Sequence, residues 1–195
     1  MSGKLNSCIY GVVALVTVLG VPAAPLNAQS MEEKAELCAG CHGMDGKPVD
    51  KTIPTIWGQQ LGYLYIQLRD FKRGDRKNGI MQPIASSMER DDMLAIADYF
   101  SKKPWPDLGQ PAAPKEVANR AVRANGSVGC TGCHLDQFQG DGTVPRLAGM
   151  SREYLTKTIA DFRTRARGNN PGMSDLMLAT APDDLAALAE YLSGR

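Results

Sequence analysis

Cys38-Ala39-Gly40-Cys41-His42 recurs in the second half of the chain as Cys130-Thr131-Gly132-Cys133-His134. The two copies contain both histidines of the protein and four of its five cysteines. Two cysteines separated by two residues and followed directly by histidine form the attachment signature of haem c. Each copy therefore predicts one covalently bound haem, with thioether bonds from both thiols and an iron–nitrogen bond from the histidine.

Three other interpretations of a Cys-x-x-Cys pair are a disulfide, a redox-active thiol pair and half of a zinc site. The histidine that ends both copies argues against the first two. After residue 28 the chain has no further cysteine that could complete a cysteine-rich zinc site. We therefore favour haem attachment by Cys38, Cys41, Cys130 and Cys133, with His42 and His134 as iron ligands.

The two motifs belong to an internal repeat. When the motifs are superimposed and one compensating insertion and deletion is allowed, residues of the same type coincide along the chain: Pro54 with Pro145, Gly58 with Gly149, Tyr63 with Tyr154, Phe71 with Phe162, Met81 with Met173 and Tyr99 with Tyr191. A repeat of this length indicates a duplicated domain rather than a solenoid. We expect one domain at 29–103 and a second at 116–195, joined by a proline-rich linker at 104–115.

Both domains are predicted to be helical. Apolar residues recur at intervals of three and four along 61–71 and 155–162, and again along 93–100 and 185–192. This spacing places them on one face of a helix. No segment alternates apolar and polar residues convincingly, and 43–54 and 140–145 are predicted to be loops. The expected fold class is therefore all-α.

A sixth iron ligand has to come from elsewhere in each domain. Met81 and Met173 are the only methionines that coincide in the repeat, whereas their rivals Met88 and Met177 do not. Both lie in segments rich in glycine, asparagine and proline, which we interpret as loops. We predict Met81 as the ligand of the first iron and Met173 as that of the second, a Met/His pair that raises the reduction potential.

The first 28 residues are predicted to be a secretory signal. Lys4 precedes an apolar run at 9–21, and small residues lead to a cleavage site after Ala28. The run is shorter than the roughly 20 residues that a membrane-spanning helix needs. An uncleaved anchor is the alternative interpretation, and in either case we expect a periplasmic protein.

Charge is nearly balanced, with 22 Lys and Arg residues against 21 Asp and Glu. This balance argues against a nucleic-acid partner, which would require a basic excess. Basic residues do gather before each predicted methionine ligand: Arg69, Lys72, Arg73, Arg76 and Lys77, and then Arg163, Arg165 and Arg167. They form either a solvated surface or, at Arg76 and Arg167, partners for haem propionates.

The whole chain resembles the dihaem cytochromes of the cytochrome c4 family. The resemblance lies in the tandem motifs, the Pro-x-x-x-Gly segments at 54–58 and 145–149, the two methionines and the matched closing helices. It implies two tandem class I cytochrome c domains related by a pseudo-twofold axis, with propionates near the interface. It also implies periplasmic or membrane-associated electron exchange with redox proteins. Trp57 departs from the pattern, because such proteins usually have a small residue there.

Two axial ligands leave no open iron position for oxygen or peroxide. We therefore expect an electron carrier in a respiratory chain, working between a dehydrogenase or cytochrome complex and an oxidase or reductase, rather than an enzyme. One alternative is a dedicated electron-transfer subunit of a periplasmic dehydrogenase complex. A small haem oxidase or peroxidase is a further alternative, which would require one methionine to be absent or labile.

Overall fold

The computed structural model describes residues 30–195, and the predicted signal sequence lies outside them. The described residues form nine helices and no strand, which confirms the all-α prediction. The helices are α1 (Met31–His42), α2 (Leu61–Arg73), α3 (Met81–Ser86), α4 (Arg90–Ser101), α5 (Lys115–Val128), α6 (Thr131–His134), α7 (Arg152–Arg163), α8 (Pro171–Ala179) and α9 (Pro182–Ser193). No helix of this part of the chain is long and apolar enough to cross a membrane.

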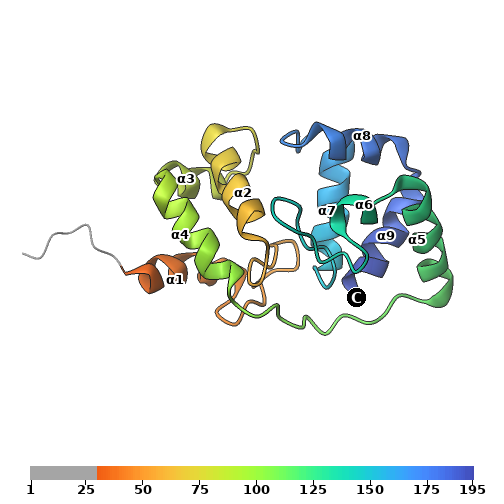
Figure 1. Ribbon diagram of the computed structural model, residues 1–195, viewed down its shortest axis with the longest axis horizontal. Coiled ribbons are helices and arrows are strands. Elements are labelled where there is room, and N and C mark those ends of the chain that lie inside the picture. The colour runs from red at the N-terminus through yellow and green to blue at the C-terminus, as the bar shows by residue number, and fades with distance from the viewer. Residues whose placement is uncertain (1–29) are drawn as a thin grey trace, which may run out of the picture.

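The helices form two halves that lie side by side (Figure 1). In the first half α2 packs against α3 and α4, and α1 packs against α4. In the second half α9 packs against α5 and α7, and α7 packs against α8. The four helices expected from periodicity are α2, α4, α7 and α9, whereas α1 and α5 were not predicted.

The helix α1 explains how the first motif is presented. The hydroxyl of Ser30 accepts the backbone N–H of Glu33, and the Glu33 carboxylate accepts the N–H of Ser30. This capping box satisfies two N–H groups that a helix start leaves without partners. The motif then occupies the C-terminal end of the helix, which Gly43 caps. In the second half, α5 ends at Gly129 and the short α6 carries the motif instead.

The core of the first half is built on the predicted apolar faces of α2 and α4. Leu64 from α2 meets Ile96, Ala97 and Phe100 from α4, and Ala35 of α1 completes the cluster. In the second half the corresponding helices α7 and α9 bury residues of the same positions, such as Leu155 and Leu192. The duplicated periodicity therefore produces duplicated cores, which support the region around each motif.

The extended segment between α4 and α5 is packed against both halves (Figure 1). A side chain added at Gly58 would place its Cβ 2.9 Å from the backbone nitrogen of Trp105. One added at Gly149 would place its Cβ 2.8 Å from Nε1 of the same tryptophan. The guanidinium of Arg146 also stacks on the indole ring, 4.6 Å from its centroid. Trp105 thus occupies space that the two repeat glycines leave open.

Candidate functional site

The two motif histidines are buried and are held in the same way. Nδ1 of His42 is 2.7 Å from the carbonyl oxygen of Pro54, and Nδ1 of His134 is 2.9 Å from that of Pro145. A carbonyl oxygen only accepts hydrogen bonds, so Nδ1 carries the proton and Nε2 keeps its lone pair for a metal. The sequence analysis missed this role of the prolines, although their coincidence in the repeat was a signal.

The histidines are also kept neutral. Burial lowers the pKa of His42 and that of His134 below the usual value for histidine, and this outweighs the hydrogen bonds to the proline carbonyls. The nearby charge of Arg76 lowers the pKa of His42 further. Neutral imidazole is the form that binds metals, so both rings are prepared for iron.

The four motif cysteines are free thiols in the structure. Burial raises the pKa of the Cys38 thiol to about 11 and also raises the pKa of Cys130. Redox-active cysteines have lowered pKa values, so these thiols do not resemble a thioredoxin-like pair. Within residues 30–195 there is also no group of three or more His, Cys, Asp and Glu side chains that could hold a metal ion. Two thiols beside an oriented, neutral imidazole fit haem c.

Met81 and Met173 do not lie in loops, so that prediction was wrong. Met81 is the first residue of α3, and Met173 lies in the first turn of α8. Asparagine side chains explain both helix starts: Asn78 Oδ1 accepts the N–H of Met81 at 2.9 Å, and Asn170 Oδ1 accepts that of Met173 at 3.1 Å. Asn170 is the N-cap of α8, whereas Asn78 binds the first N–H of α3 from the turn before the helix; both contacts favour a helix over the loop that composition suggested.

The rival methionines have other surroundings. Met177 is buried in the core of the second half beside Phe162 and Leu188. Met88 is partly buried and packs against the core of the first half. Both fill apolar space, as methionine commonly does in protein cores. Met81 and Met173 are both half-exposed and lie in equivalent helix starts, although Met173 also packs against the core of the second half.

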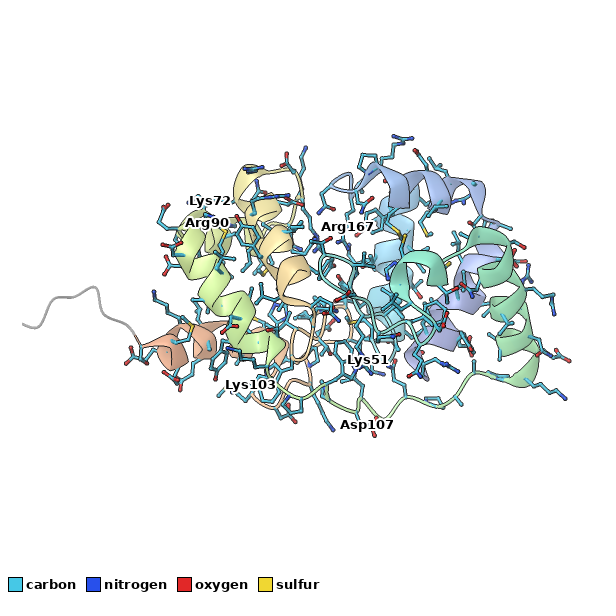
Figure 2. The ribbon with its side chains drawn as sticks, viewed as in Figure 1. Lys51, Lys72, Arg90, Lys103, Asp107 and Arg167 are labelled. Carbon is cyan, nitrogen blue, oxygen red and sulfur yellow. The ribbon has the colours of Figure 1, made fainter. Side chains whose placement is uncertain are left out.

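Arg76 and Arg167 meet at the interface between the halves, where Figure 2 shows Arg167. Arg76 Nη2 donates to the hydroxyl of Tyr154 at 3.3 Å, and Arg167 Nη2 donates to that of Tyr63 at 3.1 Å. Each arginine therefore binds the tyrosine of the other half, and the two tyrosines coincide in the repeat. Arg167 is only 6% exposed, so the solvated-surface interpretation is wrong for this residue.

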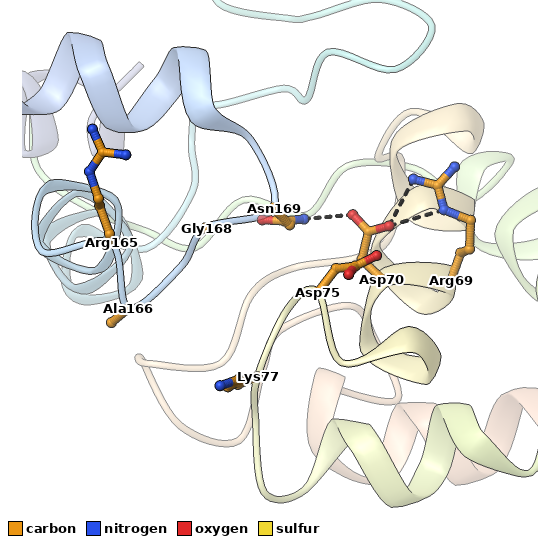
Figure 3. Close-up of a pocket in the computed structure, with 8 residues that line it drawn as sticks. All are labelled: Arg69, Asp70, Asp75, Lys77, Arg165, Ala166, Gly168 and Asn169. Atoms are coloured by element: carbon orange, nitrogen blue, oxygen red, sulfur yellow. Dashed lines mark hydrogen bonds and ion pairs between the residues drawn. The ribbon is translucent and has the colours of Figure 1, made fainter.

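A pocket of about 710 Å³ opens beside this interface (Figure 3). Arg69, Asp75 and Lys77 line it from the first half, and Arg165 and Asn169 from the second. Asp70 also lines it and is 2% exposed. The Asp70 carboxylate accepts two hydrogen bonds from Arg69, at 3.0 and 2.8 Å, and one from Asn169 at 2.8 Å. Basic residues from both predicted clusters thus share one groove.

Tyr154 should make the stability of the fold depend on pH. Burial raises the pKa of its phenol, but the charges of Arg76 and Arg167 lower it more, to about 7. An unfolded tyrosine keeps its proton up to about pH 10. The free energy of unfolding should therefore increase from pH 7 to pH 10, by at most about 1.4 kcal/mol per pH unit. Denaturant titrations at pH 7 and 9 would measure this increase in the free energy of unfolding. If a Tyr154→Phe variant showed the same increase between the two pH values as the wild type, the prediction would be wrong.

Comparison with known proteins places these features in a family. The sequence model described as cytochrome c matches residues 33–103. A cytochrome c4 of Pseudomonas aeruginosa is 30% identical over 199 residues, which cover 97% of this chain and 99% of that protein. The chain belongs to the cytochrome c4 family. This membership confirms the tandem class I cytochrome c fold, the haem c cofactor and the role of electron carrier.

Other members of the cytochrome c4 family and its relatives agree in length and fold. The crystal structure of reduced recombinant cytochrome c4 from Pseudomonas stutzeri is 27% identical and superimposes with a TM-score of 0.73, covering 86% of this chain and 99% of that one. A thiosulfate dehydrogenase electron acceptor of Stutzerimonas stutzeri strain A1501 is 33% identical over 200 residues, covering 95% and 93% of the two chains. The whole chain therefore has electron-transfer relatives.

Proposed function

We propose that this protein carries two haem c groups and passes electrons between redox proteins of the periplasm. The observation that supports the proposal most strongly is the duplicated, buried histidine, which donates Nδ1–H to a proline carbonyl beside two free thiols in each half. Cys38 and Cys41 would attach the first haem, with His42 and Met81 as ligands. Cys130 and Cys133 would attach the second, with His134 and Met173.

The residues of each half have distinct tasks in this mechanism. When bound, haem supplies an iron that changes between the ferric and ferrous states without making or breaking bonds. The carbonyls of Pro54 and Pro145 hold the imidazole rings in one orientation and raise their basicity. Met81 and Met173 would supply thioether ligands, which favour the ferrous state. Arg76 and Arg167 provide positive charge for propionates at the interface.

The relatives support a proposal for the partners and the location of the protein. The similarity to a thiosulfate dehydrogenase electron acceptor supports a dehydrogenase as the donor. We propose an oxidase or reductase as the acceptor, as expected for an electron carrier of a respiratory chain. We place the protein in the periplasm, after removal of residues 1–28, as two domains at 29–103 and 116–195. Peripheral attachment to the membrane is compatible with this role. A permanent place in a dehydrogenase complex is the second candidate, which stable co-purification with a catalytic chain would distinguish.

The number of haems can be tested on the purified protein. Intact-mass measurement should give the chain without residues 1–28 plus two haems. A Cys38→Ala/Cys41→Ala variant should lose the first, and a Cys130→Ala/Cys133→Ala variant the second, because each attachment needs its own thiols. A wild-type mass with a single haem would overturn the proposal, as would a ferric spectrum without the methionine-to-iron band.

A further inference from the structure

Gln67, on α2, holds three donors at one oxygen atom. Its side-chain Oε1 accepts from Arg76 Nη1 at 2.7 Å, from Arg167 Nη2 at 2.9 Å and from Asn169 Nδ2 at 3.1 Å. Arg76 belongs to the first half, whereas Arg167 and Asn169 belong to the second. Gln67 is only 8% exposed, so water does not replace this acceptor. One neutral carbonyl therefore joins guanidinium groups from both halves.

The two guanidinium groups repel one another, and this shared acceptor offsets part of the repulsion. Within the part of the chain that the structure describes, neither Arg76 nor Arg167 forms an ion pair with a carboxylate. Each instead stacks on a phenylalanine of its own half, with 4.6 Å from Arg76 to the ring centroid of Phe71 and 4.4 Å from Arg167 to that of Phe162. Like charges in a water-poor interface interact strongly. The Gln67 oxygen thus fixes how close together both charges stay.

This junction is present on one side of the interface only. The residue that coincides with Gln67 in the repeat is Thr158, whose side chain is too short to make the same contacts. The surroundings of the coinciding aspartates differ as well. Asp70 is buried and bound by Asn169 of the other half, whereas Asp161 is half-exposed and pairs with Lys157 of its own helix. The interface therefore combines symmetric Arg–Tyr pairs with an asymmetric set of hydrogen bonds around Gln67 and Asp70, which the second half does not repeat.

We propose that Gln67 couples the two redox centres of the protein by holding Arg76 and Arg167 at one oxygen atom. Movement of one arginine when its half changes charge then alters the position of the other arginine, and so the electrostatic surroundings of the other half. Gln67 acts as a positioning residue, and the quantity it sets is the separation of the two midpoint potentials. The inference rests on the proposed presence of two haems.

Another glutamine of the interface provides a matched control. Gln59 is 1% exposed and also crosses between the halves, because its amide donates to the backbone carbonyl of Arg146 at 3.0 Å and accepts the Arg146 N–H at 2.8 Å. Among the described residues it forms no hydrogen bond with Arg76 or Arg167. Removing its hydrogen bonds should weaken the interface without changing the hydrogen bonds of Arg76 and Arg167. The variant therefore distinguishes an effect of arginine position from an effect of interface stability.

The experiment is a potentiometric titration of the wild-type holoprotein and of Gln67→Leu and Gln59→Leu. In Gln67→Leu we expect the separation of the two midpoint potentials to change. The change should shift the distribution of one electron between the haems by roughly fivefold, which is the low end of the coupling usually found between two sites in a protein. In Gln59→Leu the potentials should stay in place while the protein becomes less stable. Gln67→Glu keeps an acceptor for both arginines, so it should keep the separation and lower both potentials.

Two results would overturn the inference. One is a Gln67→Leu protein that carries both haems and titrates like the wild type. The other is an equal change of separation in Gln59→Leu, which would assign the effect to interface strength alone. A wild-type protein with one haem would instead refute the proposed function, and mass measurement of the same samples distinguishes that failure from the other two.

Discussion

Replacing Met173 by alanine should lower the midpoint potential of the second haem by roughly one to several tenths of a volt, within the ~0.8 V range that axial ligands control. The thioether stabilises ferrous iron, and water or an added ligand would take its place in the variant. The first haem should keep its potential and its methionine-to-iron band. Met81→Ala should produce the same change at the first haem only. Potentiometric titration followed in the visible and far-red spectrum would measure both effects.

The rival methionines provide the controls for this prediction. Met177→Leu and Met88→Leu replace side chains that pack against the cores of their halves. Such volume-conserving changes usually cost less than about 1.5 kcal/mol and should leave both bands intact. Loss of a band in Met177→Leu together with its retention in Met173→Ala would reverse the assignment. Ready cyanide binding by the wild type would favour a haem with an open position, as in a small peroxidase.

Replacing Trp105 by alanine should lower the free energy of unfolding by about 2–4 kcal/mol, near the lower end for large aromatic residues. The indole packs against the core of the second half and under Arg146, and its backbone lies against Gly58 of the first half. Without the indole, the linker keeps its backbone contact with Gly58 but loses its packing against the core of the second half and against Arg146. We expect the two halves to unfold in separate steps, which denaturant titration followed by circular dichroism would show.

A second substitution in the same linker tests whether this effect is specific. Leu108 is half-buried but belongs to none of the core clusters of the described residues. Leu108→Ala should therefore cost much less than Trp105→Ala and leave a single transition. Equal losses in the two variants would mean that the linker as a whole, rather than the tryptophan, holds the halves together.

Features that depend on short stretches of sequence were predictable. The apolar faces of α2, α4, α7 and α9 follow from local spacing, and the attachment motifs are contiguous. The starts of α3 and α8 were missed because asparagine favours both helix starts and turns, and composition alone does not distinguish these outcomes. Trp57, which departs from the family pattern, packs against the core of the first half, and its ring lies close to Gly46.

The interface was the least predictable part. The acceptors for His42 and His134 are backbone carbonyls, which any residue type could provide, so only the repeat pointed to the prolines. Arg76 and Tyr154 are far apart in sequence and meet because the halves pack in one particular way. The spacing of apolar residues predicts the helices of each half, but it contains no information about how the two folded halves pack against each other.

The reciprocal Arg–Tyr contacts are the pattern of an isologous dimer, in which residue i of one subunit meets residue j of the other and the reverse also holds. Joining two such subunits in one chain makes their association independent of concentration. It also releases them from symmetry, since in a homodimer every substitution occurs twice. Gln67 and Thr158 occupy equivalent positions of the repeat, and such a difference between equivalent positions is possible only when both halves belong to one chain. Gene fusion would in this way have allowed two identical carriers to diverge into unequal ones.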